Sequence, residues 1–99
     1  MIWAPSALAD ADAIAEFIAR DSSDRAALFV TRLFEASELL ARSREMGRVI
    51  PELGDEARRE ILVGAYRVMY RIEEDQIFIV AIVHGARNWP EPPMDDPGE

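Results

Sequence analysis

The side chains of this 99-residue chain that could do chemistry are its single histidine, its arginines and a few of its carboxylates. Histidine changes charge closest to neutral pH, which suits His84 to proton transfer. Cleavage of RNA needs a base for the 2′-hydroxyl group, an acid for the leaving oxygen and cations on the phosphate. Glu52 or His84 could be that base. The cations could come from Arg59, Arg67, Arg71 or Arg87.

Each of these side chains also has a purely structural interpretation. For His84 we favour a structural hydrogen bond at the end of a strand over an acid–base role. Arg67 and Arg71 are expected to project from one face of a strand, about 13 Å apart. They could contact acidic side chains of a partner, or they could pair internally with Glu52 or Glu60. Either arrangement would give the bidentate geometry that arginine forms with carboxylates.

The charge of the chain argues against a protein that binds nucleic acid along its surface. Nineteen acidic residues face eleven basic ones, the net charge is −8, and every basic residue is an arginine. Affinity for nucleic acid comes largely from positive charge that neutralises phosphates. Direct, extended nucleic-acid binding is therefore not expected.

Composition also bears on cofactors and location. With no cysteine and one histidine, the chain cannot form disulfides or the usual zinc sites, and we expect neither a metal nor a cofactor. No segment reaches about 18 consecutive apolar residues, so no membrane span is expected. The absence of a secretory signal and of cysteine favours a cytoplasmic location.

The second half of the chain predicts a sheet. Two β-rich runs separated by an acidic turn at residues 73–76 are typical of a hairpin. Apolar and polar positions alternate in residues 66–72, so one face of that strand is apolar. Residues 77–83 are apolar throughout, which is typical of a strand in the middle of a sheet, covered on both faces. Further strands are expected over residues 59–65 and, at an edge, over residues 1–4.

The first half predicts two helices. Apolar residues recur at helical spacing over residues 6–20 and 24–42, and the polar break between them makes the helices an antiparallel pair. Asp10 is expected to face away from the core, and Val30 is expected to join it. Apolar residues that fall outside the two core stripes include Phe17, Leu28 and Leu39.

These elements predict an α+β fold of the order strand, helix, helix, strand, strand, strand, or β-α-α-β-β-β. Residues 43–56 contain two glycines and a proline and are expected to be a loop. A helical hairpin would cover one face of a mainly antiparallel sheet. Residues 1–90 would form one domain, and residues 91–99 an acidic, proline-rich tail that we expect to be flexible.

This arrangement, with these residues, resembles the RelE/ParE superfamily of bacterial type II toxins over nearly the whole chain. The motifs that carry the resemblance are Trp3-x-Pro5-x-Ala7, Gly47-Arg48-x-x-Pro51-Glu52, Arg59-Glu60, Tyr66-Arg67-Val68-x-Tyr70-Arg71-Ile72 and His84-Gly85-Ala86-Arg87-x-Trp89-Pro90. The last of these is more similar to the ParE branch than to the ribosome-dependent nuclease branch.

The resemblance implies a toxin that is made together with a neutralising antitoxin, whose C-terminal segment folds over the helical hairpin and along the sheet. ParE-like toxins act on DNA gyrase and have no known hydrolytic chemistry, whereas RelE-like toxins cut mRNA on the ribosome. Two departures disfavour the nuclease branch. The chain has no lysine, and Gly85 follows the histidine where some nucleases carry a tyrosine.

We therefore expect a toxin that arrests growth by inhibiting DNA gyrase through protein–protein contact, that is not an enzyme, and that a ParD-like antitoxin neutralises. The alternative is a ribosome-dependent mRNA endonuclease that uses Glu52, Arg67 and His84. The resemblance places the antitoxin contacts at Phe17, Leu28, Arg32, Leu39, Arg67 and Arg71. Candidate contacts with the target are Arg59, Arg87 and Trp89.

Overall fold

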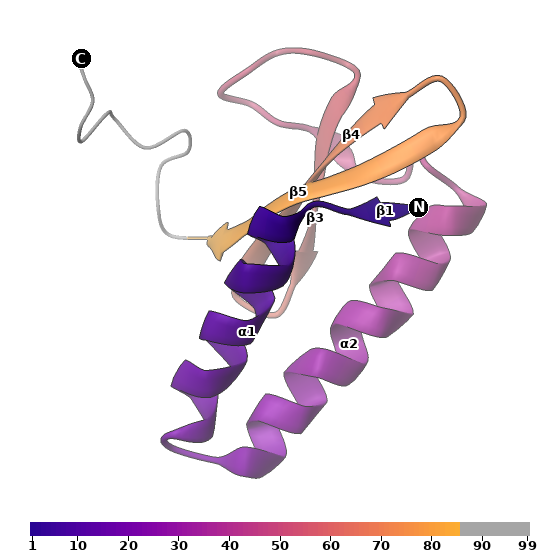
Figure 1. Ribbon diagram of the computed structural model, residues 1–99. Coiled ribbons are helices and arrows are strands. Elements are labelled where there is room, and N and C mark those ends of the chain that lie inside the picture. The colour runs from indigo at the N-terminus through magenta and orange to yellow at the C-terminus, as the bar shows by residue number, and fades with distance from the viewer. Residues whose placement is uncertain (86–99) are drawn as a thin grey trace.

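Both predicted helices are present in the computed structural model, which describes residues 1–85. Helix α1 (Pro5–Ala19) begins with a proline, whose fixed φ and missing N–H suit a first turn. Helix α2 (Ser23–Arg42) follows Ser22, whose side-chain oxygen accepts a hydrogen bond from the backbone N–H of Arg25 at 3.1 Å. The helices form the expected antiparallel hairpin (Figure 1).

Five strands form one sheet: β1 (Ile2–Trp3), β2 (Arg48–Val49), β3 (Arg58–Val63), β4 (Tyr66–Glu73) and β5 (Gln76–His84). Their spatial order is β1-β5-β4-β3-β2. Strand β1 runs parallel to β5, and the other neighbours are antiparallel. This confirms the predicted α+β fold. The central strand is β4, however, while the apolar β5 lies between β4 and the short edge strand β1.

Strands β2 and β3 differ most from the sequence prediction. Strand β2 lies within residues 43–56, which were predicted to be a loop, and its two residues are too few to show an alternating pattern. It forms because β3 offers an edge, on which Arg48 pairs with Glu60. Strand β3 ends at Val63 rather than at residue 65, because Gly64 has a φ of 59° and belongs to the turn.

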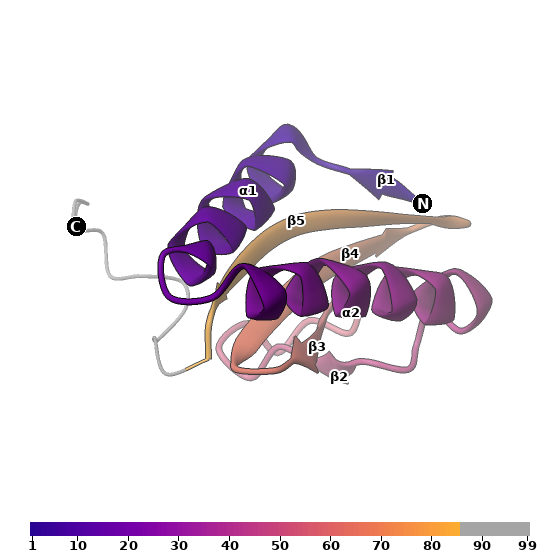
Figure 2. The same ribbon diagram turned by 90° about the horizontal axis from the view of Figure 1, so that it is seen from below.

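The helical hairpin covers one face of the sheet. Helix α1 lies against β5 and α2 lies against β3 (Figure 2). The core between the layers consists of Ala7, Phe29, Leu33, Leu40, Val63, Val68, Tyr70, Ile77, Ile79 and Ile82. Val30 does not join it and is 39% exposed, because Phe29 and Leu33 already face the sheet and Val30 lies on the neighbouring flank of α2. Asp10 also departs from the prediction, since its carboxylate accepts a hydrogen bond from the backbone N–H of Ile82 at 3.0 Å.

The opposite face of the sheet is covered in part by the segment that contains β2. Ile50 and Leu53 from this segment line a cavity of about 260 Å³ together with Val80 and Ala81 of β5. The backbone N–H of Ile50 donates to the carbonyl of Arg58 at 3.0 Å, which holds the segment on the sheet. This cover explains why β5 is apolar on both faces although it is not the central strand.

Two further sequence predictions concern membranes and the C-terminus. Within residues 1–85, neither helix combines the length and the apolar character needed to cross a bilayer. Arg87, Trp89 and the tail of residues 91–99 lie outside the described residues.

Candidate functional site

An apolar depression of about 320 Å³ lies between the helical hairpin and the turn that joins β3 to β4. Its lining residues from the helices include Phe17 of α1 and Leu28 of α2, which are 62% and 46% exposed. From the sheet it receives Tyr66 and the residues of the β3–β4 turn. Two arginines of α2, Arg25 and Arg32, contribute the basic groups of its lining.

A second depression, of about 340 Å³, continues from the first along α2 and β3. The two share Arg32, Val63 and Gly64, and the second adds Leu39, which is 47% exposed, and Leu62, which is 63% exposed. We call the two depressions together the α2–β3 groove. The structure thus brings together along one groove four residues that the sequence resemblance assigned to antitoxin contact: Phe17, Leu28, Arg32 and Leu39.

The α2–β3 groove is lined by apolar side chains together with two arginines, Arg25 and Arg32, and two acidic residues, Asp21 and Glu35. Contiguous exposed apolar surface on a small protein marks an interaction site. Arg25 has an acidic neighbour in Asp21, but the two groups are 4.0 Å apart and largely exposed, so their attraction is weak. The arginines can therefore pair with carboxylates of a partner at little cost to the fold.

Leu62 and Phe34 are among the exposed apolar residues that were not singled out from the sequence. Leu62 lies in a strand whose sequence does not show which strands pair with it. The order of the strands in the sheet shows that Leu62 lies near an open edge. Phe34 is the most exposed large apolar side chain among the described residues, at 69%. Its position outside the core stripe of α2 is the same signal that pointed to Leu28 and Leu39, but Phe34 lines neither part of the groove.

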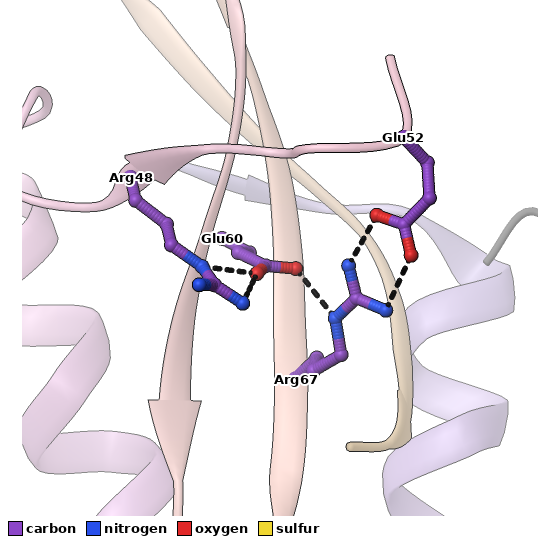
Figure 3. A network of polar contacts seen from close by, with 4 residues as sticks. All are labelled: Arg48, Glu52, Glu60 and Arg67. Atoms are coloured by element: carbon purple, nitrogen blue, oxygen red, sulfur yellow. Dashed lines mark hydrogen bonds and ion pairs between the residues drawn. The ribbon is translucent and has the colours of Figure 1, made fainter. Parts of the chain in front are cut away.

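On the opposite face of the sheet, four charged residues form a network (Figure 3). The side chain of Glu60 is fully buried between Arg48 and Arg67, and each arginine donates from Nε to one of its carboxylate oxygens at 2.6 Å. Arg67 also donates from both terminal nitrogens to Glu52, at 3.0 and 2.7 Å. This network ties the segment after β2 to β3 and β4.

The structure shows Arg67 in the internal pairing that was one of its two interpretations. Its side chain is only 6% exposed and two internal carboxylates hold it, so the structure has the internal pairing rather than an arginine displayed to a partner. The hydrogen bond with Glu52 raises the pKa of Arg67 above its ordinary value; burial opposes this, and Glu60 adds to it. Arg67 is therefore a firmly charged structural group.

The three residues of the alternative nuclease do not form one site. Glu52 and Arg67 meet on the face of the sheet that is opposite to the helices. His84 is the partner of Tyr66 across β4 and β5, and the rings of the two lie edge to face at 5.4 Å. Because neighbouring residues of a strand point to opposite faces, Arg67 and Tyr66 lie on different faces. His84 is thus on the helix side, away from the Glu52–Arg67 pair.

The remaining predicted residues occupy separate positions. Arg71 forms an exposed ion pair with Glu73 at 3.2 Å and its guanidinium lies 4.5 Å from the centre of the Phe78 ring. Arg59 donates to the carbonyl of Gly47 at 2.9 Å and so holds the chain before β2. Within the described part of the chain, no group of three or more acidic or histidine side chains is arranged to hold a metal ion.

Comparisons with known proteins agree with this geometry. A family model described as "ParE toxin of type II toxin-antitoxin system, parDE" matches residues 1–89. A solved structure of the "Chromosomal ParDE TA system from P. aeruginosa" is similar with a TM-score of 0.66. The match covers 83% of this chain and 90% of that chain at 21% sequence identity, so it concerns the fold. A comparison with curated protein sequences finds no match.

Proposed function

Since this chain belongs to the ParE toxin family of type II toxin–antitoxin systems, we propose that it inhibits DNA gyrase by protein–protein contact and that a ParD-like antitoxin neutralises it. It acts in the cytoplasm, arrests growth, and needs neither a cofactor nor a membrane. It is not an enzyme and makes no extended contact with nucleic acid.

The observation that carries the antitoxin part of the proposal is the α2–β3 groove. Four exposed side chains lie along this groove: Phe17, Leu28, Arg32 and Leu39. An amphipathic helix that places apolar residues on Leu28 and Leu39 is the segment that such a groove accepts. Acidic side chains on that helix can pair with Arg25 and Arg32 in the bidentate geometry of arginine and carboxylate.

The charged network supports the non-enzymatic part. A general base must be within reach of the proton it removes and must not be held by a stronger partner. Glu52 is held by two hydrogen bonds from Arg67, and His84 lies on the other face of the sheet. Arg67 is buried and paired, so it is poorly placed to hold a phosphate. The alternative ribosome-dependent mRNA endonuclease is therefore disfavoured.

A supercoiling assay tests the target. Purified toxin at increasing excess over gyrase should block supercoiling of relaxed plasmid, and prior incubation with the antitoxin should restore it. Unimpaired supercoiling at high excess, without a trapped gyrase–DNA cleavage complex, would contradict gyrase as the target. Codon-positioned mRNA cuts after induction that disappear in His84→Ala would favour the nuclease instead.

A matched pair of charge substitutions tests the groove. Leu28→Glu places a carboxylate in the groove, whereas Leu8→Glu does the same at a residue that is 52% exposed and lines no part of it. With the antitoxin from the neighbouring reading frame, Leu28→Glu should raise the Kd at least about tenfold, because apolar contact is lost and a charge is desolvated. Leu8→Glu should leave the Kd unchanged. Equal effects of the two substitutions would place the antitoxin elsewhere.

A further inference from the structure

The cavity of about 260 Å³ on the face of the sheet opposite to the helices is lined by two arginines, Arg58 of β3 and Arg71 of β4. The two are partners in the register of these strands, so their side chains lie side by side on one face. Arg58 is two residues from Glu60 and Arg71 is four residues from Arg67, which places both arginines on the face of the charged network. We call this depression the Arg58–Arg71 cavity.

The two arginines repel each other. Like charges at directly opposite positions of neighbouring strands destabilise a sheet. Nε of Arg58 is 3.6 Å from the carboxylate of Asp55, which is too far for a hydrogen bond, and Arg71 pairs with Glu73 at 3.2 Å. Both carboxylates are more than half exposed, and exposed ion pairs contribute little. An anion bound between Arg58 and Arg71 would therefore relieve a repulsion that the free chain retains.

Arg71 is held in a position that suits such an anion. Its guanidinium lies 4.5 Å from the centre of the ring of Phe78, its partner on β5. A guanidinium stacked on an aromatic ring keeps the N–H groups at its edge available for a carboxylate or a phosphate. Because the stacking already restricts the side chain, binding of an anion costs Arg71 little further conformational entropy.

The rest of the lining of the Arg58–Arg71 cavity is mainly apolar and includes Ile50, Leu53, Val80 and Ala81. A β-bulge on β5 shapes this part. Neighbouring residues of β4 pair with Ile79 and Ala81, so Val80 between them has no partner on that strand. Bulges bend a strand, re-aim its side chains and are over-represented beside functional sites. The cavity can thus accept an apolar side chain next to the anionic group.

We propose that the Arg58–Arg71 cavity is the surface with which the toxin binds its target, through a segment of the target protein that carries a carboxylate beside an apolar side chain. The inference rests on the proposed inhibition of gyrase by protein–protein contact and specifies the surface that makes this contact. The carboxylate bridges the two guanidinium groups, and the apolar side chain enters the cavity. Arginine in a desolvated pocket is typical of the residues that dominate the energy of a protein interface.

The charge of the whole chain favours a protein partner over a nucleic acid at this cavity. The net charge of −8 opposes the approach of a phosphate backbone, whose binding needs many positive contacts along its length. Two arginines suit one or two acidic groups instead. The apolar lining adds no affinity for a phosphate group, whereas it stabilises an apolar side chain by removing it from water.

Neutralising each arginine in turn tests the proposal. Arg58→Gln and Arg71→Gln each remove one positive charge. Arg44→Gln is the matched control, because Arg44 also forms an exposed ion pair, with Asp75 at 3.2 Å, and lines no part of the cavity. In the supercoiling assay, the toxin concentration for half-inhibition should rise at least about tenfold in either cavity variant, because a charge-assisted hydrogen bond is lost. It should change less than about twofold in Arg44→Gln.

Two further measurements distinguish a binding role from a structural one. The Tm of both cavity variants should stay close to that of the wild type, because each loses an exposed ion pair but also the repulsion between the arginines. Their Kd for the antitoxin from the neighbouring reading frame should also be unchanged, because the cavity and the α2–β3 groove lie on different faces of the sheet.

NMR of wild-type toxin labelled with nitrogen-15 examines the contact without a substitution. The Nε–H signals of Arg58 and Arg71 should shift or broaden when gyrase is added, and the signal of Arg44 should not. Unchanged signals of both cavity arginines at saturating gyrase would overturn the proposal. Shifts with inorganic phosphate that gyrase does not produce would assign the cavity to a small anion instead.

The outcomes separate this inference from the proposed function. Wild-type toxin that leaves supercoiling unimpaired would contradict both. Equal inhibition by the wild type and all three variants would overturn the target site at the Arg58–Arg71 cavity and leave gyrase inhibition intact. A tenfold loss of antitoxin affinity in the cavity variants would assign the cavity to the antitoxin. Shifts of the Arg58 and Arg71 signals with the concentration of free toxin would assign it to a second copy of the chain.

Discussion

Replacing Glu60 by glutamine tests whether the charged network holds the sheet together. The Glu60 side chain is fully buried and accepts from Arg48 and Arg67, each at 2.6 Å. A hydrogen bond to a charged group contributes about 1.5–3 kcal/mol, and glutamine keeps only one accepting oxygen, so the loss of one of the two bonds costs about 2 kcal/mol. The new amide N–H₂ faces an arginine and adds about 1 kcal/mol. Glu60→Gln should lower the free energy of unfolding by about 3 kcal/mol, or the Tm by about 12–24 °C.

Two further substitutions provide comparison values for the loss of unfolding free energy in Glu60→Gln. Glu52→Gln changes the other partner of Arg67, but Glu52 is 29% exposed, so the loss should be about 1 kcal/mol. Asp75→Asn removes an ion pair with Arg44 in which Asp75 is 97% exposed, and it should change stability by less than about 0.5 kcal/mol. Chemical denaturation measures all three. If Glu60→Gln cost no more than Asp75→Asn, the buried network would contribute little to stability and our account of it would be wrong.

Two more predictions concern single hydrogen-bonding side chains. Burial raises the pKa of Tyr70 above 10.0, so the folded state holds this proton more tightly than the unfolded chain, and the free energy of unfolding should fall as the pH rises above about 10. Tyr70→Phe removes the bonds to Arg44 and Gly47, which should cost about 1–2 kcal/mol at neutral pH and flatten the alkaline fall seen in denaturation at several pH values. Asp10→Ala should speed amide exchange at Ile82 and promote self-association on sedimentation, whereas Asp10→Asn, which keeps an acceptor, should do neither. Unchanged exchange at Ile82 in Asp10→Ala would contradict the hydrogen bond through which α1 covers the β5 edge.

Much of the fold follows from patterns that are local in the sequence. Helical spacing of apolar residues predicted both helices to within a residue or two, because a helix that covers a sheet must keep one apolar stripe. The same pattern identified Phe17, Leu28 and Leu39 as apolar residues outside the stripes, and all three line the α2–β3 groove. These three groove residues on the helices were thus predictable without knowledge of the sheet.

Of the two-residue strands, β1 was expected at an edge of the sheet, but β2 was not predictable in the same way. The sequence of residues 43–56 predicts a loop because β2 is too short for a repeating pattern and exists only through its pairing with β3. The position of β4 at the centre of the sheet follows from β1 pairing with β5 and β2 pairing with β3. The open edge at Leu62 is a consequence of that order, and residues near it in sequence carry no sign of it.

By itself, the sequence determined the fold class, the helical hairpin and the surplus of apolar residues on α2, since these depend on the spacing of residues a few positions apart. Only the tertiary structure decided the roles of the arginines. Arg67 and Arg71 stand in the same alternating pattern, yet Arg67 is buried by carboxylates seven and fifteen residues away, while Arg71 remains exposed. Burial and ion pairing depend on which distant segments meet, and a local pattern does not contain that information.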